Sequence, residues 1–262
     1  MTNIDRRAVL AAFDRQIRRQ PAATPPDGWV EREDRIVRCG GRGWAGVTWS
    51  DLDELTADAE IAAQIDRFAG TRARWEWKHY SYDEPADLAD RLVAAGFTPE
   101  PAEALLVAEI ADLTLEMPPP AGVELRPVRD PAGIEALVSV HDQVFGGDHA
   151  SMGETLLADL VAQPQRIAAV VAFAGDVPIS TGRVELPVGT DFASLWGGGT
   201  LPDWRRRGVF RSLVAHRAAV ASAAGFRYLQ VDAMPDSRPI LERLGFVELA
   251  TTTPFTYPGN AD

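Results

Sequence analysis

The stretch "SLWGGGTLPDWRRRGVFRSLVAHR", Ser194–Arg217, decides the fold, because it joins a glycine-ended strand to an arginine-rich helix start. The chain as a whole is acidic, with 26 basic and 38 acidic residues and a formal net charge of −12. Yet Arg205, Arg206, Arg207 and Arg211 crowd the beginning of the predicted helix. A helix N-terminus already carries partial positive charge, so each added cation is unfavourable by roughly 0.3–1 kcal/mol. The pattern indicates a missing negative partner.

The helix itself is predicted from apolar residues that recur at i, i+3, i+4 and i+7. They share one face with Arg217 and are Val209, Phe210, Leu213, Val214, Ala218, Val220, Ala221 and Ala224. The unpaired N–H groups and the dipole at a helix N-terminus bind phosphate. Gly208 lets a ligand approach the backbone closely, and arginines add charge-assisted hydrogen bonds. The stretch therefore predicts a site for a phosphate-bearing ligand, and a solvated arginine cluster is the simpler alternative.

The surrounding sequence predicts an α/β domain with a mixed sheet. Alternating or continuous apolar runs predict its strands, and Gly175-Asp176 is expected to turn one hairpin. The strands are expected at 123–128, 166–174, 177–188, 192–201, 227–234 and 251–258. Longer periodic segments predict helices at 132–145, 151–163 and 237–246.

A proline-rich linker, "LEMPPPAGVELRPV" (Leu115–Val128), divides the chain. Consecutive prolines cannot continue a helix or enter the middle of a sheet. We expect one domain at 1–117 and a second at 118–262. The segment 74–100 parallels 227–249, each with an aromatic strand, a short helix and a Gly-Phe stop. We favour an internal duplication, with chance similarity as the alternative.

The region after the linker resembles the GNAT-type N-acetyltransferase superfamily. The resemblance rests on a strand, then Pro202, then R-x-x-G-x at Arg205–Val209, and on "ILERLGF" at Ile240–Phe246. Phe210 stands where that family usually has Gly or Ala. Neither a Walker lysine nor a G-x-G-x-x-G pattern is present at this helix, which weakens a nucleotide-binding alternative. The resemblance implies a GNAT-like fold, in tandem with a degenerate N-terminal half.

The same resemblance implies acetyl-CoA as the acyl donor and an amine, on a small molecule or a peptide, as the acceptor. The implied pyrophosphate-holding residues are Arg205, Arg206, Arg207, Gly208, Val209, Phe210 and Arg211. Gly199, Thr200 and Leu201 are implied to face pantetheine, since a parted strand edge can pair with amides.

Proton transfer needs a base for the amine and an acid for the thiolate. Glu185 and Asp232 are the candidate bases. Leu241 stands where the family often has a tyrosine acid, so Ser237, with Tyr257 or water as alternatives, is a candidate substitute. His141 and His149 are further candidate bases. The segment "HDQVFGGDH" could also suggest metal ligands, but a helix end with a glycine turn explains it more simply, and its spacing matches no standard metal site. Trp196 is expected either to line the acceptor pocket or to be core, whereas Trp204 is expected to pack.

Other features narrow the hypothesis. "RCGGRG" (Arg38–Gly43) also spells R-x-x-G-x-G, but an extended segment follows, which favours a glycine turn. The single Cys39 and the absence of a leader-like segment favour a cytoplasmic protein, monomer or homodimer. The acidic balance and short apolar runs argue against nucleic-acid and membrane partners. The sequence predicts an acetyl-CoA-dependent N-acetyltransferase without a metal, and a non-catalytic acyl-CoA-binding sensor is the alternative.

Overall fold

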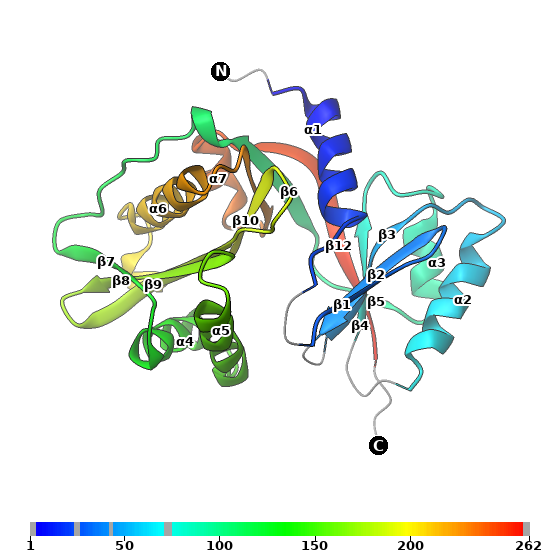
Figure 1. Ribbon diagram of the computed structural model, residues 1–262, viewed down its shortest axis with the longest axis horizontal. Coiled ribbons are helices and arrows are strands. Elements are labelled where there is room, and N and C mark those ends of the chain that lie inside the picture. The colour runs from blue at the N-terminus through cyan, green and yellow to red at the C-terminus, as the bar shows by residue number, and fades with distance from the viewer. Residues whose placement is uncertain (1–3, 24–26, 42–43, 71–74, 259–262) are drawn as a thin grey trace. The chain divides into compact units, whose positions relative to one another are not determined.

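The computed structural model describes residues 4–23, 27–41, 44–70 and 75–258, and these residues form two compact units (Figure 1). The C-terminal unit contains Val107–Val231 and Pro239–Val247. The N-terminal unit contains Asn3–Leu106, Asp232–Arg238 and Glu248–Asp262. Each unit is described by itself.

The sheet of the C-terminal unit is mixed, as the sequence predicts. Its order is β11 (Tyr228–Ala233), β10 (Phe192–Thr200), β9 (Val177–Glu185), β8 (Ile167–Ala174) and β7 (Val123–Pro127). β10 and β11 are parallel, and the other neighbours in this series are antiparallel. The predicted β8–β9 hairpin is confirmed, with Gly175 at φ 62° in its turn. Glycine adopts this left-handed conformation without steric cost.

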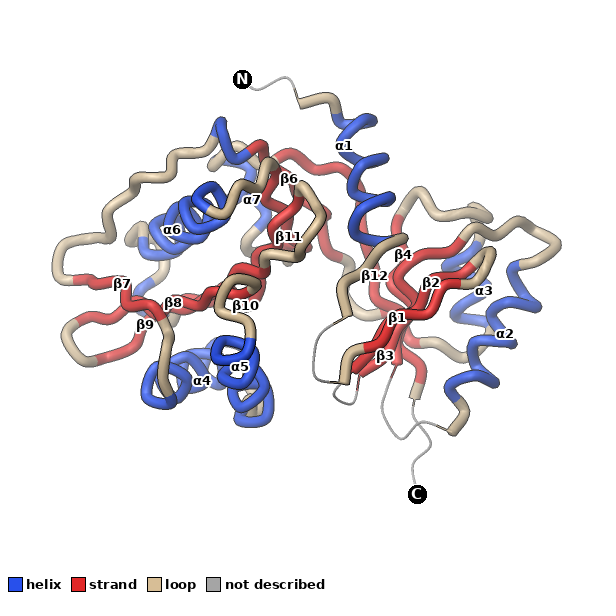
Figure 2. Tube along the Cα trace, viewed as in Figure 1, coloured by secondary structure: helices blue, strands red, loops and turns tan. Residues whose placement is uncertain are grey.

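Helices cover both faces of this sheet. α4 (Pro131–Phe145) and α5 (Ala150–Ala162) lie on one face, and α6 (Val209–Ala223) lies on the other (Figures 1 and 2). Along β8, Ala169 and Val171 pack in the cluster under α4 and α5, whereas Val170 and Ala172 pack with α6. Successive strand side chains point to opposite faces, so burial on both faces explains the continuous apolar run of β8.

The N-terminal unit begins with α1 (Arg6–Phe13) and a π-helical turn (Asp14–Arg18). Its strands and helices then follow as β1 (Trp29–Arg32), β2 (Ile36–Gly41), β3 (Trp44–Ser50), α2 (Ala57–Phe68), β4 (Trp75–Tyr80), α3 (Leu88–Ala94), β5 (Thr98–Pro99) and the start of β6 (Glu103–Glu109). A short 3-10 turn, Ile110–Asp112, follows β6. The first four residues of the "RCGGRG" motif, Arg38–Gly41, lie in β2. The chain continues as β3 rather than as a helix, as predicted. Residues 42–43 of that motif lie outside the described residues.

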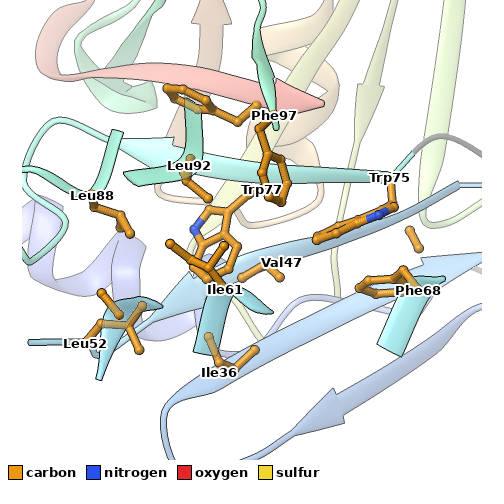
Figure 3. Packing of buried hydrophobic residues seen from close by; sticks show 13 residues of the cluster. Ile36, Val47, Leu52, Ile61, Phe68, Trp75, Trp77, Leu88, Leu92 and Phe97 are labelled. Carbon is orange, nitrogen blue, oxygen red and sulfur yellow. The ribbon is translucent and has the colours of Figure 1, made fainter. Parts of the chain in front are cut away.

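The core of the N-terminal unit is built around two buried tryptophans of β4. Trp75 and Trp77 are 2% and 1% exposed. Figure 3 shows them among Ile61 and Phe68 of α2 and other apolar side chains from β2, β3 and α3. The ring centroids of Trp75 and Phe68 are 4.5 Å apart, with the ring planes tilted by 32°. These rings fix α2 against the sheet, because large buried aromatics dominate core energetics.

The structure supports the predicted internal duplication. In both units a parallel strand pair is followed by a short helix and a Gly-Phe stop, first as β3–β4–α3 and then as β10–β11–α7 (Arg238–Arg243). Gly96 and Gly245 have φ values of 100° and 105°. The N–H groups of Phe97 and Phe246 donate to the carbonyls five residues earlier at 3.0 and 3.1 Å. Both helices therefore end in the same glycine-dependent motif.

The last strand of the chain completes the N-terminal unit. β12 (Val247–Tyr257) follows α7, but its residues 252–257 pair antiparallel with β4, and the order of this unit is β1-β2-β3-β4-β12-β6. β12 also pairs with β5. The compact units are thus interleaved along the chain, and the predicted division at 117/118 stays a prediction about sequence halves.

We expect a fragment of residues 1–117 to lack a cooperative unfolding transition, because without β12 the strand β4 loses its antiparallel partner. A fusion of the same fragment to residues 246–258 through a flexible linker should regain the transition. Urea unfolding followed by circular dichroism measures both. Cooperative unfolding of the bare fragment would show that β12 is dispensable.

Candidate functional site

The two parallel strands of the C-terminal unit part after a short paired segment. β10 and β11 are in register only from Phe192 with Tyr228 to Ser194 with Gln230. β10 continues to Thr200 and β11 to Ala233 without further paired residues between these two described strands. The parting exposes an edge of β10, which can pair with an amide-bearing ligand.

Three glycines in this open part of β10 let helices approach it from both faces. The register with β9 shifts between Trp196 and Gly199, which marks a bulge. A Cβ placed on Gly197 would lie 2.8 Å from the ring of His141 of α4. A Cβ placed on Gly198 would lie 3.1 Å from Phe210 of α6. Only glycine fits contacts this close, so the bulge is held between α4 and α6.

The N-terminus of α6 presents unpaired backbone N–H groups, which we call the cradle. Gly208 is its N-cap, with φ 94° and no side-chain cap. The first bond of the helix runs from the Ser212 N–H to the Gly208 carbonyl at 3.1 Å, which leaves the N–H groups of Val209, Phe210 and Arg211 without acceptors inside the helix. Such groups together with the helix dipole bind phosphate.

The four arginines of the motif surround this cradle and are exposed. Among the described residues, none of them forms an ion pair with Asp or Glu, although the chain carries 38 acidic residues. Arg205 donates from Nε to the Thr200 carbonyl at 3.1 Å, and the Arg207 guanidinium lies 4.9 Å from the Trp204 ring centroid. Arg206 has φ 62°, which is strained for a residue with a side chain.

The proline linker is anchored at the same helix end. The Ser212 hydroxyl lies 3.2 Å from the Pro118 carbonyl, and a Cβ on Gly208 would lie 3.9 Å from Pro120. Figure 1 shows the linker running past α6 before it enters β7. The linker thus borders the cradle. Phe210, the departure from the family pattern, points its ring toward Gly198 of β10, so its side chain lies away from the backbone N–H groups.

The three residues expected to face pantetheine have backbone groups already engaged on one side. The Gly199 carbonyl accepts from the Ser180 hydroxyl at 2.7 Å, and the Leu201 N–H donates to the Ile179 carbonyl at 2.9 Å. The Thr200 carbonyl accepts from Arg205. These bonds fix the outer end of β10, and the predicted contact with pantetheine stays a prediction.

A buried arginine lies under the bulge. Arg217 of α6 is 2% exposed, and its Nε and Nη1 donate to the carbonyls of Leu213 and Arg183 at 3.0 and 3.3 Å. A Cβ on Gly182 of β9 would meet its guanidinium at 2.6 Å. Burial lowers the pKa of Arg217 to about 10, so the group stays cationic at neutral pH. Its charge lies beneath the sheet at the point where β10 bulges.

A cluster on the α4 face of the bulge was not chosen as a site from the sequence. His141 is buried, and its Nε2 lies 3.2 Å from the Gly197 carbonyl, so Nε2–H donates. The Asp142 carboxylate accepts from both the backbone N–H of His149 at 3.0 Å and its Nδ1 at 2.8 Å. The two histidine rings are 5.3 Å apart between centroids. Gly146 and Gly147, with φ 74° and 85°, fold the chain back so that His149 reaches Asp142. That glycine turn between two histidines was the available signal.

The predicted catalytic residues lie in different places. Glu185 of β9 is paired with Arg183 at 3.2 Å in the C-terminal unit. Asp232 belongs to the N-terminal unit, where its carboxylate lies 3.2 Å from the ammonium of Lys78, the single lysine of the chain. Ser237, in the same unit, donates to the Met234 carbonyl at 3.1 Å in the turn before α7. Their catalytic roles stay predictions.

The tryptophans differ in exposure. Trp196 is 41% exposed on the bulge, with the Arg183 guanidinium 5.7 Å from its ring centroid, so it is not a core residue. Trp204, in the 3-10 turn Pro202–Trp204, packs against the core beside Val209, as expected. Leu241, at the position of the family's tyrosine, is buried and carries no hydroxyl.

The equivalent helix start in the N-terminal unit carries acidic residues instead of arginines. α2 follows β3 as α6 follows β10, but its start is preceded by Asp53. The Asp53 carboxylate accepts from the N–H groups of Leu55 and Thr56 at 3.0 and 2.9 Å. Asp58 and Glu60 add negative charge in the first turn. This end repels anions, in contrast to α6.

No protein-family model and no curated protein matches the sequence. Among solved structures, a GCN5-related N-acetyltransferase from Kribbella flavida matches over 97% of this chain and 95% of its own, with a TM-score of 0.66 and 20% identity. A functionally unknown conserved protein from Staphylococcus epidermidis matches over 94% and 98%, with a TM-score of 0.65 and 14% identity. A tandem GNAT protein from the clavulanic acid biosynthesis pathway matches over 92% and 86%, with a TM-score of 0.57 and 16% identity.

These likenesses show the fold. The chain has the fold of the GNAT N-acetyltransferases, which confirms the expectation from the Arg205–Val209 motif. More particularly, it has the tandem form of that fold, since a tandem GNAT protein matches over 92% of its length.

No helix among the described residues is long and apolar enough to cross a membrane. No group of three or more His, Cys, Asp and Glu side chains in the described ranges is arranged to hold a metal ion.

We expect Arg206→Gly to raise the free energy of unfolding by about 0.5–1 kcal/mol, because glycine removes the strain of a left-handed residue at φ 62°. Arg207→Gly is the matched control: it loses the same charge one residue on, where φ is not positive, and should lower stability by a similar amount. Urea denaturation measures both. Equal destabilisation by the two variants would contradict the strain at Arg206.

We expect acid to destabilise the protein partly through His141. Burial, helped by nearby His149 and Arg183, lowers the pKa of His141 to about 4, below its unfolded value of about 6.5. Protonation therefore favours the unfolded state, and the free energy of unfolding falls as the pH drops from about 6.5 to about 4. His141→Gln should give a shallower fall over this window. The remaining slope comes in part from His79 and His216, whose pKa values burial also lowers. An unchanged slope would show that His141 is protonated equally in both states.

Proposed function

We propose that the protein is an acetyl-CoA-dependent N-acetyltransferase that acts on an amine by direct attack on the thioester. One observation carries the proposal: four exposed arginines, which form no ion pair with Asp or Glu among the described residues, flank an uncapped helix N-terminus beside a parted strand. Their mutual repulsion and the helix dipole are both unfavourable unless an anion binds there. The diphosphate of CoA supplies that anion, and the tandem GNAT fold supports the choice.

Different residues of the C-terminal unit bind different parts of acetyl-CoA in this proposal. The N–H groups at Val209–Arg211 and the side chains of Arg205–Arg207 hold the phosphates. The open edge of β10 at Gly199–Leu201 orients the pantetheine amides. A backbone N–H at the glycine bulge polarises the reacting carbonyl, and buried Arg217 adds positive potential there. Acetyl-CoA, when bound, supplies the activated acyl group.

The proposal extends to acceptor, compartment and domains. The acceptor is a small-molecule or peptide amine, and the exposed Trp196 beside the bulge provides it with an apolar wall. We place the protein in the cytoplasm, as a monomer or homodimer. The N-terminal half completes the fold and does not bind CoA, because Asp58 and Glu60 place negative charge in the first turn of α2. Glu185, Asp232 and Ser237 remain candidates for proton transfer.

A non-catalytic acyl-CoA-binding module is the second candidate. The buried Leu241 in place of a tyrosine acid favours it. Two measurements separate the candidates. Acetyl-CoA should raise the melting temperature in a thermal-shift titration where ATP does not. Thiol release with a panel of amines should then occur for the enzyme and not for the module.

We expect Gly208→Glu to abolish CoA binding, because the substitution places a carboxylate in the cradle at a residue with φ 94°. Gly225→Glu is a matched control: Gly225 also has a positive φ, 85°, and follows the other end of α6 with open space around it. Both variants carry the same strain and charge, and only the first should lose affinity in isothermal titration calorimetry with CoA. Equal affinities for the two variants would place the phosphates elsewhere.

A further inference from the structure

Two of the candidate bases named from the sequence form ion pairs in the structure. Glu185 is ion-paired with Arg183 through Oε1, and Asp232 is ion-paired with Lys78 through Oδ2. The titratable cluster beside the bulge on the α4 face consists instead of His141, His149 and Asp142. His141 contacts the Gly197 carbonyl, and its ring lies against that of His149.

The hydrogen bonds at His149 fix its tautomer. The Asp142 carboxylate accepts from Nδ1, which places the ring proton on that atom and leaves Nε2 as an acceptor. The same carboxylate oxygen accepts from the backbone N–H of His149, so the residue is held at two points. The side chain of His149 is 29% exposed, which gives water and a ligand access to it. His141 is less accessible to a ligand than His149, because it is buried and its Nε2–H donates to the Gly197 carbonyl.

We propose that His149 is the general base of the acetyl transfer and that Asp142 is its positioning residue. The inference rests on the proposed function. His149 Nε2 takes one proton from the acceptor ammonium, directly or through one water. The neutral amine nitrogen then attacks the thioester carbon: the C–N bond forms, the C–S bond breaks, and the thiolate leaves with the bonding pair. The second proton of the amine passes to the thiolate, and the imidazolium returns its proton to solvent.

The test compares two kinds of acceptor with acetyl-CoA as donor. Spermidine, benzylamine and a lysine peptide are ammonium ions at neutral pH and need a base. Hydroxylamine is uncharged there and does not. His149→Ala should lower kcat/KM for the best ammonium acceptor by about 100-fold, the lower end of general-base effects, and leave the hydroxylamine rate nearly unchanged. Added imidazole should restore part of the lost rate.

Further variants separate catalysis from structure. His149→Gln should repeat the acceptor-selective loss, and Asp142→Asn should show a smaller loss of the same selectivity, with kcat affected more than KM. His216→Ala, on α6 at the opposite face of the sheet, is the control and should behave as the wild type. Calorimetry with CoA confirms that each variant is folded and binds donor.

The outcomes are distinct. Equal losses with ammonium acceptors and hydroxylamine, or no loss with either, would overturn the role of His149 while leaving the proposed function intact. A wild type that acetylates hydroxylamine alone also overturns it, because no base is then at work. A wild type that binds CoA but releases thiol with no acceptor overturns the proposed function itself.

Discussion

The close approach of two helices to the glycines of β10 is the contact on which the rest of the C-terminal unit depends. His141 of α4 packs against Gly197, and Phe210 of α6 packs against Gly198. With side chains at these positions neither helix could come as near, and the bulge between Trp196 and Gly199 would have no support. Because the bulge turns β10 away from β11, the same contact opens the strand edge beside the start of α6. The open strand edge, the bulge and the start of α6 therefore depend on the same packing contacts.

The fold was largely predictable from the sequence because its signals are local. Glycines with positive φ end the helices and turn the hairpin at 175, 225 and 245, and the residue type alone indicates such positions. The apolar run of β8 indicates a strand buried on both faces. The cradle was predictable for the same reason, since Arg205–Gly208 is contiguous.

What the sequence did not reveal depends on contacts between distant residues. Arg217 was placed on the apolar face of its helix by spacing, but its position beneath Gly182 needs β9 to be known. The pairing of Asp232 with Lys78 joins residues far apart in the chain. The sequence predicts β12 as a strand but not its pairing with β4, because a strand pattern does not indicate which strand lies beside it. The sequence offers His149 as one of four candidate bases, but its contact with Asp142 depends on how the chain turns at Gly146 and Gly147.

The two halves of the duplication differ most where a ligand would bind. Their helix stops agree to within a few degrees in φ, whereas one helix start carries arginines and the other carries Asp58 and Glu60 in its first turn.

The position of β12 has a consequence for synthesis. The N-terminal unit is translated first but needs the last strand of the chain to cover β4. While the ribosome works, the edge of β4 stays open, and an open strand edge is a template for unwanted pairing. The N-terminal unit therefore cannot be completed until β12 has been made.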